Sequence, residues 1–286
     1  MGHARTFWTA YTRARDAGGV LVLRNEDLDP QRSKQMFADA MLEDLYWLGI
    51  RWHEGPGVGG TFGPYSQSQR REPYLKIWKE LLGRGYLYPC TCSRRELSGI
   101  AQAPHDHPSE QVRRGPRADA PVRPAVRFEG DEGPMYPGTC RTKKPGAELA
   151  QEYENPAGVN WRFRVPDGEV VAFEDGHFGP QRFVAGEDFG DFPVWRRDDV
   201  PAYQLAVVAD DRAMRITEVV RGADLLLSTA RQILIYRALG WEPPQWYHCS
   251  LVVDERGERL AKRHDALAIR TLREQGRTPG EVLGLA

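Results

Sequence analysis

Three cysteines are spaced as metal ligands rather than as a disulfide framework. Cys90 and Cys92 are separated by one residue, and Cys140 follows beyond a long polar segment. Zinc binds tetrahedral sets of thiolate and imidazole donors, so these residues would supply three of four ligands. Ligand chemistry favours His105 or His107 as the fourth, and a closed set of four would be structural. The alternative is that the cysteines are buried free thiols.

Carboxylates cluster where a short apolar run ends. Glu26, Asp27 and Asp29 follow the run at residues 20–23. Carboxylates in such a cluster act as general acids or bases, bind metal ions, or line a solvated turn. Because ligands of open α/β sheets bind at the carboxyl ends of strands, Glu26 is a candidate binding residue.

An arginine and a tyrosine mark a second candidate site later in the chain. Arg221 follows an apolar run at residues 216–220, and Tyr203 precedes another at residues 205–208. A guanidinium at the end of an apolar strand needs a partner, which is either a carboxylate of the same chain or an anionic ligand. The residues alone favour an internal salt bridge.

Two further segments carry groups suited to phosphate. Gly2 and His3 lie at the start of a predicted helix, where free backbone N–H groups and the helix dipole can bind phosphate, although most such pairs are only caps. A charged loop that contains Arg259 and Lys262 follows an apolar run at residues 251–253. Charge runs of this kind are usually solvated surface.

The first ninety residues alternate between helical and strand patterns. Helical spacing of apolar residues continues up to the first Gly-Gly pair, and residues 20–23 form an apolar run typical of a buried parallel strand. Asp29 and Pro30 are suited to the first positions of an amphipathic helix that ends at Gly49, and another ends at Gly83. This alternation predicts an α/β fold.

The middle of the chain differs from the first ninety residues in composition and in the spacing of its apolar residues. Residues 101–131 are rich in Pro, Arg, Asp, Glu and His and have little apolar periodicity, so we expect a flexible surface excursion there. Residues 161–165 and 169–173 flank a Pro-Asp-Gly triplet, which predicts a hairpin. Beyond Tyr203 the sequence again shows the apolar runs and helical pattern typical of an α/β fold.

A capping box is expected in this last part of the chain. Thr229 is followed three residues later by Gln232, which is typical of a helix start, and Gly240 would end that helix.

Composition narrows the class of protein without indicating a function. The chain has 286 residues, 41% of them hydrophobic, and a net charge of -1, so any contact with nucleic acid must come from local basic patches. No stretch approaches the ~20 apolar residues that span a bilayer, and no leader is recognisable, so the cytoplasm is the expected compartment. Four cysteines are too few for a secreted disulfide scaffold.

The first motif resembles a known family. The run Gly-His-Ala-Arg-Thr, followed by a helix, Gly-Gly, a short strand and the RxEDxD pattern around Glu26, resembles the start of the glutamyl class of class I aminoacyl-tRNA synthetases. Gly-His would be the second half of the HIGH signature, which implies that Gly2 and His3 bind ATP and that His3 is catalytic. The arginine, serine and first histidine that precede it in the family are absent, so the first strand is expected to be missing.

The later motifs resemble the same family. Cys-x-Cys paired with Tyr-x-x-x-Cys resembles the glutamyl-queuosine tRNA(Asp) synthetases, which implies Tyr136, rather than a histidine, as the fourth ligand of one structural Zn²⁺. Matching residues imply that Glu26 holds the ammonium group of glutamate and that Tyr203 and Arg221 hold its side-chain end.

The charged loop resembles the KMSKS loop of these enzymes. Its residues are Arg259, Leu260, Ala261, Lys262 and Arg263. Lys262 occupies the place of the second lysine, which implies a catalytic role in binding ATP and stabilising charge on its phosphates. Mg²⁺ would accompany the ATP.

The resemblance implies activation of L-glutamate with ATP and its transfer to queuosine at the wobble position of tRNA(Asp). It implies a Rossmann-like catalytic core with an inserted zinc-binding subdomain: residues 1–89 and 201–286 would form the core, and residues 90–200 the insertion. Because the chain stops soon after the lysine loop, we expect no anticodon-binding domain. Separately, we expect a monomer. Two alternatives stay open, a truncated glutamyl-tRNA synthetase and a catalytically silent zinc-containing RNA-binding module.

Overall fold

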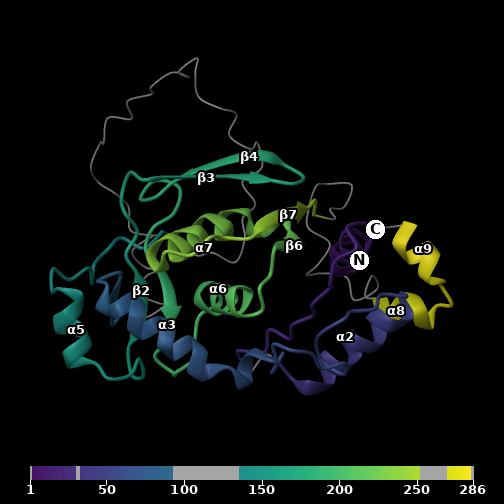
Figure 1. The fold of residues 1–286 in the computed structure, drawn as a ribbon, viewed down its shortest axis with the longest axis horizontal. Helices are drawn as coiled ribbons and strands as arrows, with labels where there is room; N and C mark the ends of the chain where they lie inside the picture. Colours follow the sequence, from purple (N-terminus) through teal and green to yellow (C-terminus); the bar gives the residue numbers. More distant parts are fainter. Residues whose placement is uncertain (1, 30–32, 93–134, 252–268, 285–286) are drawn as a thin grey trace, which may run out of the picture.

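Helices and strands alternate most regularly between residues 192 and 249, whereas the described chain begins and ends with successive helices (Figure 1). The computed structural model describes residues 2–29, 33–92, 135–251 and 269–284. The α-helices of these residues are α1 (Gly2–Asp16), α2 (Gln35–Trp47), α3 (Arg71–Gly83), α5 (Gly146–Glu152), α6 (Tyr203–Ala213), α7 (Leu226–Leu239), α8 (Ile269–Glu274) and α9 (Pro279–Gly284). The strands are β1 (Leu87–Cys90), β2 (Asn160–Phe163), β3 (Val170–Asp175), β4 (Gly179–Val184), β5 (Phe192–Trp195), β6 (Glu218–Gly222) and β7 (Gln245–Cys249).

The described strands form two sheets. The smaller sheet is antiparallel, in the order β1-β2-β5. The larger has the order β4-β3-β7-β6, in which β6 and β7 run parallel and β3 and β4 pair antiparallel. A short 3-10 helix, η2 (Ala223–Leu225), and α7 connect β6 to β7, so these elements form a parallel βαβ unit. The predicted α/β fold is confirmed.

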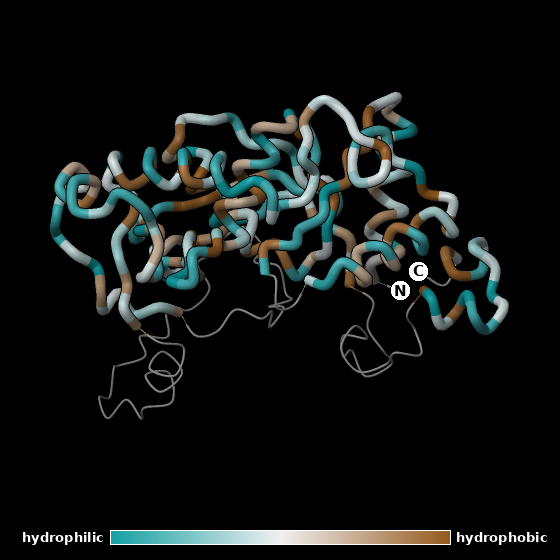
Figure 2. The backbone as a smooth tube through the Cα atoms, turned by 90° about the horizontal axis from the view of Figure 1, so that it is seen from below, coloured by the Kyte–Doolittle hydropathy of each residue, from teal (hydrophilic) through white to brown (hydrophobic). Residues whose placement is uncertain are grey.

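One core joins the two sheets through α3, α6 and α7. Tyr74, Trp78, Trp161 and Trp195 are fully buried in it. The ring of Trp78 meets that of Trp161 edge-on, with 4.9 Å between the centroids. Figure 2 shows apolar and polar stretches alternating along most of the chain, as expected for elements with one buried face.

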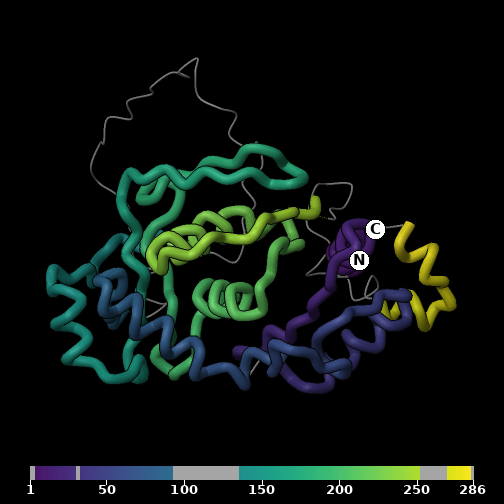
Figure 3. The backbone as a smooth tube through the Cα atoms, in the orientation of Figure 1, coloured from purple at the N-terminus to yellow at the C-terminus, as the bar shows by residue number. Residues whose placement is uncertain are grey.

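A second, smaller core lies where the two ends of the described chain meet. Ala4 of α1, Leu45 of α2, Leu272 of α8 and Val282 of α9 are buried together there. Figure 3 shows the first and last helices side by side at one end of the molecule. None of the helices in the described ranges combines the length and the apolar character needed to cross a bilayer.

The predicted strand at residues 20–23 is wrong in detail. The segment is extended, but it makes only isolated parallel bridges, from Val22 to Glu54 and from Asn25 to Ser66. Glu54 and Ser66 lie in irregular segments, so the hydrogen-bonded pairing does not extend beyond these single pairs. The segment still ends at Glu26, as expected.

The predicted start of α2 is also wrong. The helix begins at Gln35, and Lys34 rather than Asp29 occupies the N-cap position. The Asp29 carboxylate accepts a hydrogen bond from Arg196 at 3.0 Å, so a tertiary ion pair has taken the group that would cap the helix. The helix ends at Trp47, Leu48 is its C-cap, and Gly49 follows with a positive φ of 82°.

The predicted hairpin at residues 161–173 is not formed. The turn exists, since the Glu169 N–H donates to the Pro166 carbonyl at 3.0 Å, but β2 and β3 belong to different sheets. Arg141 donates hydrogen bonds to the Asp167 carboxylate and so stabilises this turn, through which the chain passes from one sheet to the other. The hairpin of this region is β3-β4 instead.

The predicted capping box is wrong as well, although α7 itself and its glycine end are confirmed. Leu225 is the N-cap, so Thr229 lies inside the helix, and Gly240 ends it with φ of 71°. The Thr229 hydroxyl donates to the Leu225 carbonyl and accepts a hydrogen bond from Arg221, while Gln232 donates to Gln204. Both side chains serve tertiary contacts instead of a cap.

Candidate active site

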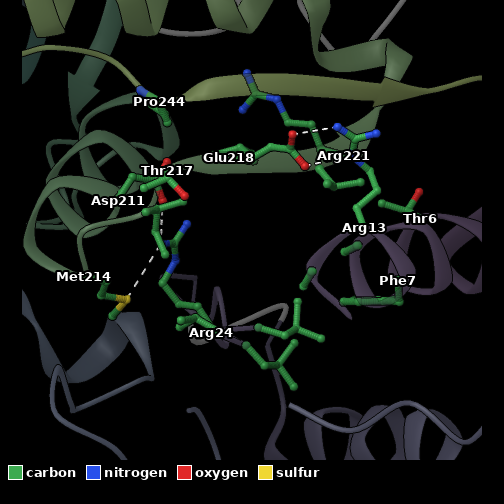
Figure 4. Close-up of a pocket in the computed structure, with 18 of the residues that line it drawn as sticks. Thr6, Phe7, Arg13, Arg24, Asp211, Met214, Thr217, Glu218, Arg221 and Pro244 are labelled. Carbon is green, nitrogen blue, oxygen red and sulfur yellow. Dashed lines mark hydrogen bonds and ion pairs between the residues drawn. The ribbon is translucent and has the colours of Figure 1, made fainter. Parts of the chain in front are cut away.

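A cavity of about 1770 Å³ lies between α1, the extended segment after it, α6 and β6. Figure 4 shows Arg24 on one side of this cavity and Glu218 and Arg221 of β6 on the other. Small-molecule pockets are typically ~300–1,000 Å³, so there is room for more than one substrate. Among the described strands, β6 pairs with β7 alone, and its other edge borders the cavity.

The three residues predicted to hold glutamate all line this cavity. Glu26 lies at the end of the extended segment, Tyr203 begins α6, and Arg221 lies near the end of β6. The Arg221 Nη1 atom is 3.5 Å from the Tyr203 hydroxyl. The fold therefore brings one carboxylate, one phenol and one guanidinium to a single space from positions far apart in the sequence.

Arg24 organises the acidic side of the cavity. Its guanidinium donates to the Glu26 carboxylate at 2.9 Å and to the Asp211 carboxylate at 2.7 Å. Burial raises the pKa of Asp211, and the neighbouring guanidinium opposes that effect. Glu26 is the exposed end of this network, so its carboxylate is the one open to a cationic ligand.

Tyr203 stays neutral over the ordinary pH range. Burial, and then the nearby Glu26 carboxylate, raise the pKa of this phenol to about 12. Its hydroxyl can therefore donate one hydrogen bond to an acceptor in the cavity and accept another.

Arg221 is buried and is held by neutral groups. Its side chain donates to His248 Nε2 at 3.1 Å and to Thr229 Oγ1 at 2.6 Å. His248 in turn lies 2.6 Å from the Asp175 carboxylate, and both of these side chains are fully buried. The expected internal salt bridge is not found, because none of the described carboxylates contacts the guanidinium. Its charge remains available to an anionic ligand.

The residues of the predicted metal site also come together. The Sγ atoms of Cys90, Cys92 and Cys140 all lie within 4.8 Å of one another. The Tyr136 hydroxyl is 3.5 Å from Cys90 Sγ and 3.8 Å from Cys92 Sγ. The cluster joins the end of β1 to the segment around Cys140 and brings the four predicted donor atoms together.

The surroundings of the cluster favour thiolate at Cys140, whereas burial and the hydrogen bond with Cys140 raise the pKa of the Cys92 thiol to about 11. Burial alone would raise the pKa of the Cys140 thiol, but hydrogen bonds from Tyr136 and the Thr91 backbone outweigh it and lower the pKa to about 6. Arg162 donates from Nε to Cys90 Sγ at 3.3 Å, and its guanidinium lies 3.8 Å above the Tyr136 ring. This buried positive charge offsets part of the charge of thiolate ligands.

Several predicted site residues lie outside the part of the structure that is described. They are the side chain of His3, the loop residues Arg259, Leu260, Ala261, Lys262 and Arg263, and the alternative zinc ligands His105 and His107, while Gly2 is described only as the first backbone residue of α1. Their assignments stay predictions.

Four residues that support the site were not predicted from the sequence. They are Arg24, Asp175, Asp211 and His248. Arg24 and Asp211 adjoin predicted segments, so their charges in otherwise apolar surroundings were a usable signal. Asp175 and His248 carry no local pattern, because the contact between them spans 73 positions of the chain.

Comparisons with known proteins show the family to which the chain belongs. The family described as "tRNA synthetases class I (E and Q), catalytic domain" matches residues 1–284. The glutamyl-Q tRNA(Asp) synthetase of Nitratidesulfovibrio vulgaris is 44% identical over 99% of this chain and 80% of its own length. That of Symbiobacterium thermophilum is 46% identical, again over 99% and 80%.

The likeness extends to glutamate–tRNA ligases, which are longer. A solved glutamate tRNA ligase from Elizabethkingia meningosepticum, in complex with its amino acid, matches with a TM-score of 0.70 and 27% identity. The match covers 96% of this chain, which spans 50% of the solved one. The resemblance seen in the motifs is therefore confirmed: the chain belongs to the class I tRNA synthetases of the E and Q catalytic-domain family, close to the glutamyl-Q tRNA(Asp) synthetases.

Proposed function

We propose that this protein activates L-glutamate with ATP and transfers the glutamyl group to queuosine at the wobble position of tRNA(Asp). The observation that carries the proposal is the convergence of Glu26, Tyr203 and Arg221 on one cavity in a chain 44% and 46% identical to two glutamyl-Q tRNA(Asp) synthetases. A truncated glutamyl-tRNA synthetase and a silent RNA-binding module are less favoured, because these relatives carry the queuosine-linked name over nearly the whole chain.

The charges of the cavity suit glutamate in one orientation. Arg221 would hold the side-chain carboxylate together with the Tyr203 hydroxyl, and Glu26 would accept hydrogen bonds from the ammonium group. With both of these groups held, the α-carboxylate is left free as the nucleophile. It attacks the α-phosphate of ATP, which forms glutamyl-AMP and releases pyrophosphate.

The second step transfers the glutamyl group to RNA. A hydroxyl of the queuosine cyclopentenediol attacks the carbonyl carbon of glutamyl-AMP, an ester bond forms, and AMP leaves. On the family resemblance, His3 and Gly2 would contact ATP, and Lys262 would stabilise charge on the phosphates, with Mg²⁺ bound to the nucleotide. The His3 side chain and Lys262 are outside the described part of the structure, and the roles of all three residues stay proposals.

We also infer one structural Zn²⁺ held by Cys90, Cys92, Tyr136 and Cys140. Tetrahedral Zn–S bonds of ~2.3 Å place sulfur atoms about 3.8 Å apart, and Cys92 Sγ and Cys140 Sγ are 3.5 Å apart. The Tyr136 hydroxyl is at a similar distance from two of the sulfurs, so the donor set fits the ion. When bound, zinc would fix the loop around Cys140 to the end of β1.

The division into core and insertion stays a proposal, as do the monomeric state and the cytoplasmic location. So does the expectation that the first strand of the catalytic core is missing. What supports the last is that β6 has one neighbouring strand in the described sheet and borders the cavity with its other edge.

The deciding experiment measures transfer of radiolabelled glutamate to three RNAs: queuosine-containing tRNA(Asp), the same tRNA without queuosine, and tRNA(Glu). We expect ATP-dependent labelling of the first alone. Labelling of tRNA(Glu) at its 3′ end would identify a glutamyl-tRNA synthetase instead. No labelling of any RNA, together with no glutamate-dependent pyrophosphate exchange, would favour the silent module.

A further inference from the structure

The guanidinium of Arg221 is held from behind by a buried imidazole. Its Nε lies 3.1 Å from His248 Nε2, on the neighbouring strand β7. Behind the imidazole, His248 Nδ1 lies 2.6 Å from Asp175 Oδ2, at the end of β3. The order carboxylate, imidazole, guanidinium therefore runs across three adjacent strands and ends at the cavity.

The chemistry of arginine determines where the imidazole carries its proton. The Nε atom of a guanidinium bears a hydrogen and can only donate, so His248 Nε2 must accept. The imidazole proton then lies on Nδ1 and is donated to Asp175. Burial lowers the pKa of His248 below its usual value, with help from the nearby Arg221 and against the hydrogen bond to Asp175, so the ring is neutral, as this hydrogen-bond order requires.

Asp175 is fixed independently of the imidazole. Its Oδ1 atom accepts hydrogen bonds from the backbone N–H groups of His177 and Phe178, at 3.0 and 2.9 Å. The backbone N–H of His248 lies 3.2 Å from Oδ2. The carboxylate therefore has a fixed direction, and so does the proton that it accepts from the ring.

We propose that Asp175 and His248 are positioning residues for the amino-acid substrate: they fix the tautomer that orients Arg221 toward the cavity. This inference rests on the proposed function, in which Arg221 binds the glutamate side chain. Thr229 completes the arrangement, because its Oγ1 accepts from Arg221 Nη2 at 2.6 Å. Two N–H groups of the guanidinium are thereby directed, a third faces the Tyr203 hydroxyl, and two are left for a carboxylate.

A neutral spacer between Asp175 and Arg221 has an electrostatic advantage. A carboxylate in direct contact with the guanidinium would compensate its charge and compete with an anionic ligand. Here the imidazole carries the orienting hydrogen bond without adding a charge. Asp175 thus sets the orientation of Arg221 without contacting it, because the His248 imidazole lies between the two side chains.

The test is the substitution Asp175→Asn, which keeps the shape of the side chain. Its amide oxygen would take the place of Oδ1 on the two backbone N–H groups, so its NH₂ group would face His248 Nδ1. The ring must then carry its proton on Nε2, where among the described groups only the Thr229 hydroxyl at 3.2 Å could accept it, and Arg221 Nε–H loses its acceptor. We expect the Kd for glutamate to rise about 10- to 100-fold, since a buried donor loses its acceptor.

Two readouts distinguish positioning from a merely structural role. The KM for glutamate should rise while the KM for ATP changes less than about twofold. Long-range ¹H–¹⁵N correlation spectra should show the Nδ1–H tautomer of His248 in the unaltered protein and the Nε2–H tautomer in Asp175→Asn. His248→Gln, which retains one acceptor and one donor, should bind glutamate better than His248→Leu.

Asp191→Asn is the matched control. Asp191 is also a buried aspartate with a backbone donor, the Val165 N–H at 2.8 Å, but it does not line the cavity. It should lower the melting temperature without the selective rise in the KM for glutamate. Equal effects of the two substitutions on that KM would overturn the inference.

The outcomes also separate this inference from the proposed function. An Nε2–H tautomer in the unaltered protein would overturn the inference whatever the substrate is. An Nδ1–H tautomer in a protein that binds no glutamate would overturn the proposed function and the ligand named here. Both the expected tautomer and a glutamate Kd that depends on Asp175 are needed to support the inference.

Discussion

Replacing Arg221 with lysine tests the assignment of the glutamate pocket most directly. An arginine side chain has five N–H groups, and three of them are directed at His248, Thr229 and Tyr203. Two are left, one on each terminal nitrogen, which is the number that a bidentate pair with a carboxylate requires. Lysine retains the charge but offers a single ammonium group, so the fork is lost.

The size of the effect follows from the hydrogen bonds that disappear. A hydrogen bond to a charged group contributes ~1.5–3 kcal/mol, and each ~1.4 kcal/mol changes affinity tenfold. The loss of one of the two bonds from Arg221 to the carboxylate should therefore raise the KM for glutamate about 10- to 140-fold. Since ATP does not contact this group in the proposed orientation, its KM should stay nearly constant.

Glutamate-dependent ATP–pyrophosphate exchange, measured over a range of each substrate, provides both constants. Arg84→Lys is a suitable control, because Arg84 donates to the Ala238 carbonyl between helices and does not line the cavity. A KM for glutamate within threefold of the unaltered protein would refute the assignment of Arg221. So would an equal rise in the KM for ATP, since it would indicate general distortion.

Three more outcomes follow. Lys262→Ala should lower the rate of pyrophosphate exchange by about 10²–10³ without unfolding the protein, and unchanged exchange would exclude the loop assignment. Metal analysis should find about one zinc per chain, lost in the double variant Cys90→Ser, Cys92→Ser, together with a lower melting temperature. The free energy of unfolding should fall as the pH drops below ~6.5, because the unfolded chain then binds a proton on His248 that the folded chain, with its lowered pKa, excludes. His248→Gln should flatten that dependence in denaturant titrations at several pH values.

Local patterns predicted the presence of α1, α2, α3 and α7, because a helix depends on residues close in the sequence. The amphipathic pattern that stops at Gly83 is α3, and the glycine that ends α7 has the left-handed conformation expected of it. Predictions failed where a side chain had a better partner at a distance. Asp29 binds Arg196 instead of capping α2, and Thr229 binds Arg221 instead of capping α7.

Sheet pairing was the least predictable feature. The turn at residues 166–168 forms as expected, but the chain crosses there from one sheet to the other. A turn triplet specifies a local change of direction, whereas the partner of a strand is chosen by the packing of distant elements. The strand expected at residues 20–23 was reduced to single bridges for the same reason.

Arg221 illustrates why the ligand-facing part of a site is easier to predict than its support. Its charge in an apolar strand indicated that it needs a partner, and the residues alone favoured a carboxylate. The structure supplies a neutral imidazole, with Asp175 behind it and 73 positions away from His248 in the sequence. A guanidinium paired directly with an aspartate would be a structural element, whereas one oriented by a neutral ring keeps its charge for a ligand. The identity of the supporting residue therefore bears on function, and only the folded arrangement of β3, β6 and β7 specifies it.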